Sequence, residues 1–142
     1  MNSSLREVET MKHAFPRKLT SWLFAASGLY GIAVLSPLYW LEGEIAKTTG
    51  GFNHAEYFYG FVGTALSAQF MFFIIAYDPI RFRPAIFFAV LEKLAFAAPV
   101  FLLWASERLS GHVVVFGGID FFWAITFAAL WVLTRNVGRE QI

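Results

Sequence analysis

Three charged residues lie within stretches of the sequence that are otherwise almost entirely apolar. Glu92 and Lys93 are adjacent near the middle of residues 84–104, and Asp120 lies within residues 112–133. A charge at the centre of a membrane helix costs roughly 2.5–3.5 kcal/mol, so such residues face a protein interior or a wet cavity. Two carboxylates against one ammonium leave one carboxylate that is either protonated or hydrated. A neutral buried carboxyl can donate or relay a proton, and this is the chemistry that the three residues could perform.

The composition is that of a membrane protein. Of the 142 residues, 58% are hydrophobic, 19% are aromatic and only 15% are charged, whereas soluble domains have about 45–50% apolar and about 25% charged residues. The net charge of +1 gives no reason to propose nucleic acid as a partner. The absence of cysteine excludes disulfides, thiolate metal sites and thiol catalysis. The length supports a single domain, residues 1–142.

Four apolar stretches are each close to the ~20 residues needed to cross the hydrocarbon core of a membrane. They cover about residues 21–41, 55–77, 84–105 and 112–133. We therefore predict an all-α polytopic membrane protein, an antiparallel bundle of four transmembrane helices. Pro16 is predicted to break any helix in the polar arm of residues 1–20, and Pro37 to kink the outer end of the first span. Residues 42–53, rich in glycine and threonine, are predicted to form a loop.

Small residues predict where the helices approach one another. Gly28 and Gly31 would allow close packing of the first span. Gly60, Thr64 and Ala68 recur every fourth residue of the second span, which predicts a helix face pressed against a neighbour.

The basic residues predict the orientation in the membrane. If the N-terminal arm, the hairpin at residues 78–83 and the tail at residues 134–142 lie on one side, the opposite side carries only Lys47 and Arg108. The positive-inside rule then places both termini in the cytoplasm, and we predict a multi-pass protein of the bacterial inner membrane. The eight basic residues on the predicted cytoplasmic side are Arg6, Lys12, Arg17, Lys18, Arg81, Arg83, Arg135 and Arg139.

The rise of the helices places four polar residues at a similar depth. Glu92 and Lys93 lie about 12–14 Å into the third span, and Asp120 about 12 Å into the fourth from the other side. Gln69 of the second span lies roughly 10 Å from the inner face by the same arithmetic. In a core about 30 Å thick they converge near the midplane. We predict a ligand pocket of Gln69, Glu92, Lys93 and Asp120 without a cofactor, with Glu92 and Asp120 as the candidate catalytic residues.

Two functions fit this pattern. The first hypothesis is that the pocket binds a lipid-like or isoprenoid small molecule, with carboxylate-mediated proton transfer as an extension. The second is a structural or accessory membrane subunit in which an intramembrane ion pair, Lys93 with Asp120, only fixes the packing of two helices. The sequence leaves open whether the protein is an enzyme. The expected partners are membrane lipids, the lipid-like ligand, and either a second copy of the chain or another membrane protein.

His54, Glu56 and His112 open two of the spans on the predicted outer side and could contribute to a metal site. On a helix, the side chains of His54 and Glu56 would point about 200° apart, so both could bind one ion only if His54 lay in the preceding loop. We favour a role at the membrane interface and predict no metal.

Short motifs in the spans resemble those of a known family. Residues 20–133 look like the small bacterial four-helix membrane proteins of the DoxX-like type, which implies the fold and the membrane location. The architecture is also similar to that of the sterol-isomerase-like (EXPERA) bundles, which bind sterol-sized ligands between helices using buried carboxylates. This resemblance implies that Glu92 and Asp120 are the ligand-binding carboxylates here. The motifs are SGLYG at 27–31, PLYWLE at 37–42, HAEYFYGFVG at 54–63, Gln69, YDPIRFRP at 77–84, LEK at 91–93 and Asp120.

Overall fold

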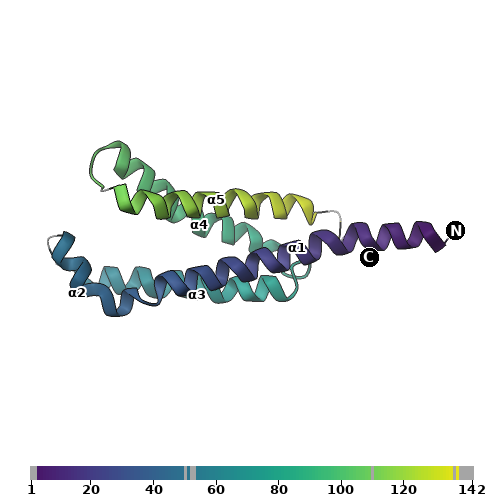
Figure 1. Ribbon diagram of the computed structural model, residues 1–142, viewed down its shortest axis with the longest axis horizontal. Coiled ribbons are helices and arrows are strands. Elements are labelled where there is room, and N and C mark those ends of the chain that lie inside the picture. Colours follow the sequence, from purple (N-terminus) through teal and green to yellow (C-terminus); the bar gives the residue numbers. More distant parts are fainter. Residues whose placement is uncertain (1–2, 50, 52–53, 110, 136, 138–142) are drawn as a thin grey trace.

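The computed structural model describes residues 3–49, 51, 54–109, 111–135 and 137. Of these, residues 3–13 and 49 are described for their backbone only. This part of the chain is all-helical, with helices α1 (Ser3–Leu35), α2 (Leu38–Thr49), α3 (Ala55–Tyr77), α4 (Arg83–Ala105) and α5 (Gly111–Leu133) (Figure 1). Four segments are long and apolar enough to cross a membrane: Ala14–Leu35, Ala55–Tyr77, Arg83–Ala105 and Gly111–Leu133. The predicted all-α fold with four membrane-type helices is confirmed. Asn53, Arg139 and the end of the predicted tail lie outside the described residues.

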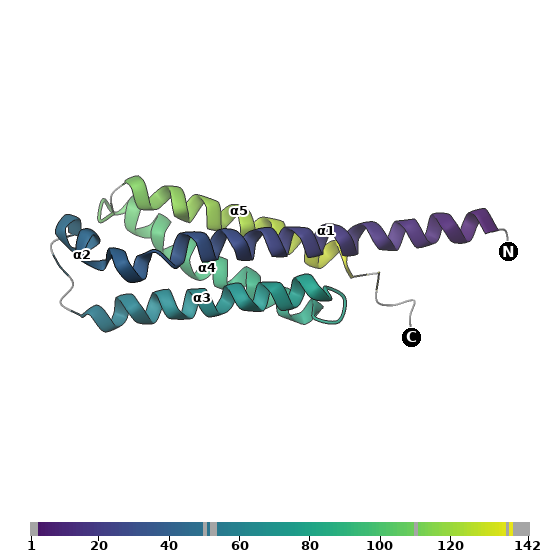
Figure 2. The same ribbon diagram turned by 60° about the horizontal axis from the view of Figure 1, so that its bottom comes forward.

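Helix α1 continues through Pro16, where the sequence predicts a break. Proline removes one backbone hydrogen bond and crowds the carbonyl four residues earlier. The first turns of α1 project beyond the other helices (Figure 2), so water can bind that carbonyl instead. On the other side of the proline, the buried Thr20 hydroxyl donates a hydrogen bond to the Pro16 carbonyl over 2.7 Å. Helix α1 therefore tolerates Pro16 and does not end there.

The structure also differs from the sequence prediction around Pro37. Helix α1 ends at Leu35, and a separate helix, α2, covers most of the predicted loop. Proline disfavours the helical conformation of the residue before it, but it is well suited to the start of a new helix. The Pro37 carbonyl accepts the N–H of Leu41 over 3.2 Å, which is the first i+4 hydrogen bond of the new α-helix. Glu44 and Lys47 then pair at 2.7 Å along α2, and such i,i+3 pairs stabilise a helix.

The four long helices form two pairs. Helix α1 packs mainly against α3, and α4 packs mainly against α5. Figure 1 shows the two pairs meeting at the end where α1 enters the bundle and α5 ends, and diverging towards α2. The short turn between α3 and α4 joins the pairs at the end where they meet. The bundle therefore has a closed half near this turn and an open half near α2.

Three phenylalanine rings hold the closed half together. Phe24 of α1 stacks on Phe127 of α5 with ring centroids 4.1 Å apart, and Phe72 of α3 meets both rings edge-on. All three side chains are fully buried. Since lipid tails are as apolar as these rings, their contribution in a membrane comes from dense packing and ring geometry. The same cluster contains Ile75, Ile86, Ala89 and Leu130.

Glycines hold each pair together. A Cβ atom at Gly31 would overlap the side chain of Gln69 in α3, and one at Gly28 would lie 3.1 Å from the ring of Phe73. In the other pair, a Cβ at Gly117 of α5 would lie only 2.6 Å from Val100 of α4. The predicted close approach at Gly28 and Gly31 is confirmed, because only glycine leaves room for the neighbouring helix at this distance.

The predicted packing of the Gly60 face is wrong. A Cβ atom at Gly60 would meet nothing within 4 Å, and Thr64 is exposed. Helix α3 instead buries another face, which carries Val62, Gln69, Phe72 and Ile75. The small residues are therefore left on a free surface that faces the open half.

Candidate functional site

The three intramembrane charges meet between α4 and α5. The Nζ atom of Lys93 lies 3.2 Å from Oε2 of Glu92 and 3.4 Å from Oδ1 of Asp120. The Lys93 side chain is only 5% exposed, against 23% for Glu92 and 17% for Asp120. One ammonium therefore bridges two carboxylates, and the group carries a formal charge of −1 when all three residues are ionised.

The buried face of α4 determines where Lys93 points. Lys93 lies on it with Ile86, Ala89, Ala97 and Val100, spaced so that they share one side of a helix. Its ammonium lies 5.2 Å from the centre of the Phe72 ring, a distance at which a ring face attracts a cation. Glu92 is the preceding residue and therefore points about 100° away around α4.

Gln69 does not join the charged group. It is fully buried where α3 packs against Gly31 of α1, and its amide Nε2 donates to the Ala65 carbonyl over 2.8 Å. Among the described atoms, its Oε1 has no hydrogen-bond partner. Gln69 was predicted to belong to the pocket from its depth alone, and depth does not determine which side of a helix a residue occupies.

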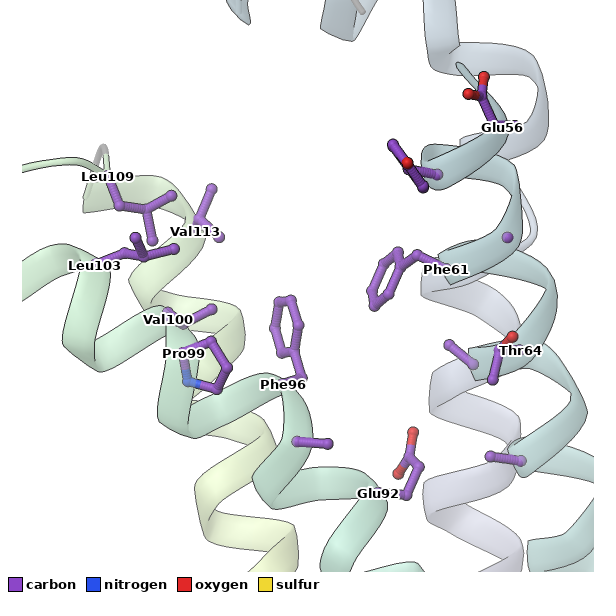
Figure 3. A pocket seen from close by; sticks show the side chains of 15 residues that line it. Glu56, Phe61, Thr64, Glu92, Phe96, Pro99, Val100, Leu103, Leu109 and Val113 are labelled. Carbon is purple, nitrogen blue, oxygen red and sulfur yellow. The ribbon is translucent and has the colours of Figure 1, made fainter. Parts of the chain in front are cut away.

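A cleft of about 860 Å³ separates α3 from α4 in the open half. Glu92 lies at its inner end, and Figure 3 shows the carboxylate pointing into the cleft. Lys93, Asp120 and Gln69 are not among the described residues that line it. The walls are otherwise almost entirely apolar: Gly60, Phe61, Thr64, Ala65 and Ala68 from α3, and Ala95, Phe96, Pro99, Val100 and Leu103 from α4, with Leu109 and Val113 beside them.

Two aromatic rings face each other across the cleft. Phe61 of α3 and Phe96 of α4 lie with centroids 5.7 Å apart at 26°, between Glu92 and the mouth (Figure 3). The sequence analysis did not single out these residues. A helical spacing signal was nevertheless present, because Phe96, Pro99 and Leu103 follow Glu92 at four, seven and eleven residues and so share its face of α4.

Polar residues gather at the mouth of the cleft. Nδ1 of His54 lies 2.8 Å from Oε1 of Glu56, and Glu56 and Tyr57 line the outer end of the cleft. His54 precedes the first turn of α3, which is the position that lets its side chain reach Glu56. His112 is exposed in the first turn of α5. Among the described residues, no group of three or more histidines, aspartates and glutamates could hold a metal ion.

The arrangement provides a hydrogen-bond acceptor at the inner end of an apolar slot. Lys93 occupies the inner side of the Glu92 carboxylate, while the cleft side faces open space. A carboxylate in apolar surroundings is unfavourable unless a donor or water satisfies it. The site therefore suits a largely apolar molecule that carries a hydrogen-bond donor.

Comparisons with known protein families, with curated proteins and with solved structures gave no match. The DoxX-like and sterol-isomerase-like resemblances therefore stay predictions. The geometry of the cleft and of the charged group is therefore the basis for a functional proposal.

Proposed function

We propose that the protein is a bacterial inner-membrane protein that binds a lipid-like or isoprenoid small molecule in the cleft between α3 and α4. The observation that carries the proposal is the Glu92 carboxylate, which lies within a membrane-type helix and points into an apolar cleft of about 860 Å³. Ligand sites typically have about 300–1,000 Å³, apolar walls and a few polar groups that orient the ligand. The apolar body would lie along the walls of the cleft, in contact with Phe61, Phe96 and Pro99, with a donor at Glu92.

The distribution of basic residues supports an orientation with both termini in the cytoplasm. Arg17, Arg81, Arg83 and Arg135 belong to segments at the closed end, whereas Lys47 and Arg108 belong to segments at the open end. The positive-inside rule favours the closed end in the cytoplasm. The cleft would then open towards the outer leaflet, where it can take up lipid-like molecules.

The test is native mass spectrometry of the protein extracted gently from its own membrane, with identification of the bound lipids. We expect a stoichiometric lipid or isoprenoid on the wild type, and its loss from Glu92→Gln, which keeps the shape but removes the charge. The matched control is Glu44→Gln, because Glu44 is an exposed carboxylate in α2. A wild-type protein that carries only bulk phospholipid, or a ligand retained fully by Glu92→Gln, would refute the proposal.

Both carboxylates pair with Lys93, but of the two only Glu92 is among the described residues that line the cleft. Proton transfer to a bound ligand would therefore involve Glu92. Incubation in deuterated water should then place deuterium on a carbon of the recovered ligand, and Glu92→Gln should prevent it. A ligand recovered without deuterium on carbon from the wild type would limit the function to binding.

A second candidate is a structural role for the charged group, and the double contact of Lys93 favours it. The Lys93–Asp120 pair connects α4 to α5, the helices that pack most extensively. If its role is only structural, Lys93→Met with Asp120→Leu should retain a stable bundle, whereas Lys93→Met alone leaves two buried carboxylates and should cost about 3–5 kcal/mol. Thermal unfolding in detergent measures both. A double variant as unstable as the single one would exclude this account.

A further inference from the structure

The cleft carries a carboxylate at each end. Glu92 lies at the inner end, and Glu56 lies at the mouth beside His54, as Figure 3 shows for the two glutamates. The described residues that line the space between them include no basic residue. Both ends therefore offer hydrogen-bond acceptors to a ligand. The Lys93 ammonium lies behind Glu92, pairs with it and with Asp120, and is not among the described residues that line the cleft.

The helical rise gives the distance between the two ends. On α3, Glu56 and Ala68 line the mouth and the inner part of the cleft, and their separation of twelve positions corresponds to about 18 Å. On α4, the eleven residues from Glu92 to Leu103 span about 16 Å. The apolar slot between the two carboxylates is therefore about 17 Å long.

The two ends place different demands on a ligand. A tail pushed against Glu92 would displace water from a carboxylate without replacing its hydrogen bonds, which is unfavourable. At the mouth, Glu56 is 68% exposed, so an apolar end there would lie among polar groups and interfacial water. A molecule with a single polar end can place a hydrogen-bond donor at only one of the two carboxylates, and its apolar end then lies against the other.

We infer that the ligand carries a hydrogen-bond donor at both ends of an apolar body about 17 Å long. This inference rests on the proposed function, because it describes the molecule that the same cleft would bind. The inner donor meets Glu92, and the outer donor meets Glu56 and His54 at the membrane surface. Hydroxyl or amino groups fit both positions, whereas a ligand carboxylate or phosphate would meet a carboxylate of the protein at each end.

The test uses defined probes in place of the native ligand. Purified protein in mild detergent is titrated with α,ω-alkanediols, with 1-alkanols and with dicarboxylic acids, in series whose extended lengths bracket about 17 Å. Binding is followed by displacement of a fluorescent fatty alcohol. The diol of matching length should bind about threefold to tenfold tighter than the alcohol of the same length, and the dicarboxylic acid should bind more weakly than either.

Two variants separate the inner end from the outer end. Glu92→Gln should weaken diol and alcohol alike, because both place a hydroxyl there. Glu56→Gln should weaken only the diol, so that the ratio of the diol and alcohol affinities falls towards one. This ratio is compared for the same ligands in each variant, which cancels their different partitioning into detergent. Glu44→Gln is the control and should change neither affinity.

The outcomes distinguish the inference from the proposed function. If diol and alcohol both depend on Glu92, but their ratio is insensitive to length and to Glu56→Gln, the cleft binds lipid-like molecules and the two-ended ligand is refuted. If no probe binds and Glu92→Gln changes nothing, the proposed function fails and the inference fails with it. A length optimum that disappears in Glu56→Gln supports the two-ended ligand.

Discussion

The closed and open halves of the bundle use similar residues in opposite ways. In the closed half, Phe24, Phe72 and Phe127 are fully buried and in mutual contact. In the open half, Phe61 and Phe96 also face each other from different helices, but Phe61 remains 44% exposed. The first set joins the two helix pairs, and the second set lines the space between them.

The glycines show the same contrast. Gly31 and Gly117 are in close contact with neighbouring side chains, whereas Gly60 faces open space. Small residues in membrane helices normally allow backbones to approach, yet no described atom of a neighbouring helix lies within 4 Å of a Cβ placed at Gly60. A bundle selected only for stability would fill such a gap, because unfilled space forfeits packing contacts. The contrast therefore favours a binding role for the open half.

The strongest test of this contrast between the two halves is the truncation of one ring in each half. Phe127→Ala removes a ring that touches Phe24 and Phe72, and it should destabilise the protein by about 3 kcal/mol. This is the low end for a packed phenylalanine, because lipid replaces water as the reference solvent. Phe61→Ala should cost less than about 1 kcal/mol, since its ring is exposed in an open cleft. Thermal unfolding in detergent measures both, and equal losses would show that the open half is packed as tightly as the closed one.

The next largest effect on stability should distinguish Gly117 of α5 from the adjacent Gly118. Gly117→Ala forces a methyl group against Val100 and should cost about 1–3 kcal/mol. The valine cannot move aside easily, because its branched side chain has few rotamers on a helix. Gly118→Ala is the matched control, since a Cβ there meets nothing within 4 Å. Both changes add the same helix propensity, so a Gly117→Ala protein as stable as Gly118→Ala would contradict the tight α4–α5 contact.

Hydropathy and helix rise predict much of this structure. The spans expected at 55–77, 84–105 and 112–133 lie within one residue of α3, α4 and α5 at each end, because apolar length and flanking turn residues determine membrane helices strongly. The same arithmetic placed Glu92, Lys93 and Asp120 at one depth, and the structure brings them together. Pro37 interrupts the helix near the predicted kink, but most of the loop predicted at residues 42–53 is helix α2. Pro16 does not break α1, because the effect of a proline depends on what satisfies the neighbouring backbone groups.

The side of each helix was harder to predict than its depth. The Gly60, Thr64 and Ala68 stripe predicts a close neighbour, but a stripe of small residues does not specify whether a helix or a ligand fills the space. Gln69 was assigned to the pocket from its depth, although it lies where α3 packs against α1. Such assignments need the pairing of the helices, and four similar apolar helices give little information on pairing before their packing is known.

A smaller effect, confined to binding, should follow from filling the cleft. Gly60→Leu places a side chain in open space, so it should leave stability unchanged or slightly higher, because leucine favours the helix more than glycine. Ligand affinity should fall by about tenfold, or about 1.4 kcal/mol. Gly118→Leu is the control, since it adds the same side chain at another open position. Unchanged lipid on Gly60→Leu in native mass spectrometry would place the ligand elsewhere, and a loss of stability would show that the face is packed.

The smallest effect concerns the attachment of α2 at the open end. The Tyr59 hydroxyl donates to Glu42 of α2 over 2.7 Å, and its ring stacks on Tyr39 at 5.8 Å. Tyr59→Phe keeps the stacking and removes a hydrogen bond worth about 1 kcal/mol. Hydrogen exchange should therefore speed up about fivefold in α2, with α4 and α5 unchanged, because only the local opening equilibrium shifts. Tyr57→Phe, an exposed tyrosine in the same turn, is the control. Faster exchange throughout the bundle would mean that α2 stabilises the whole fold and not only the open end.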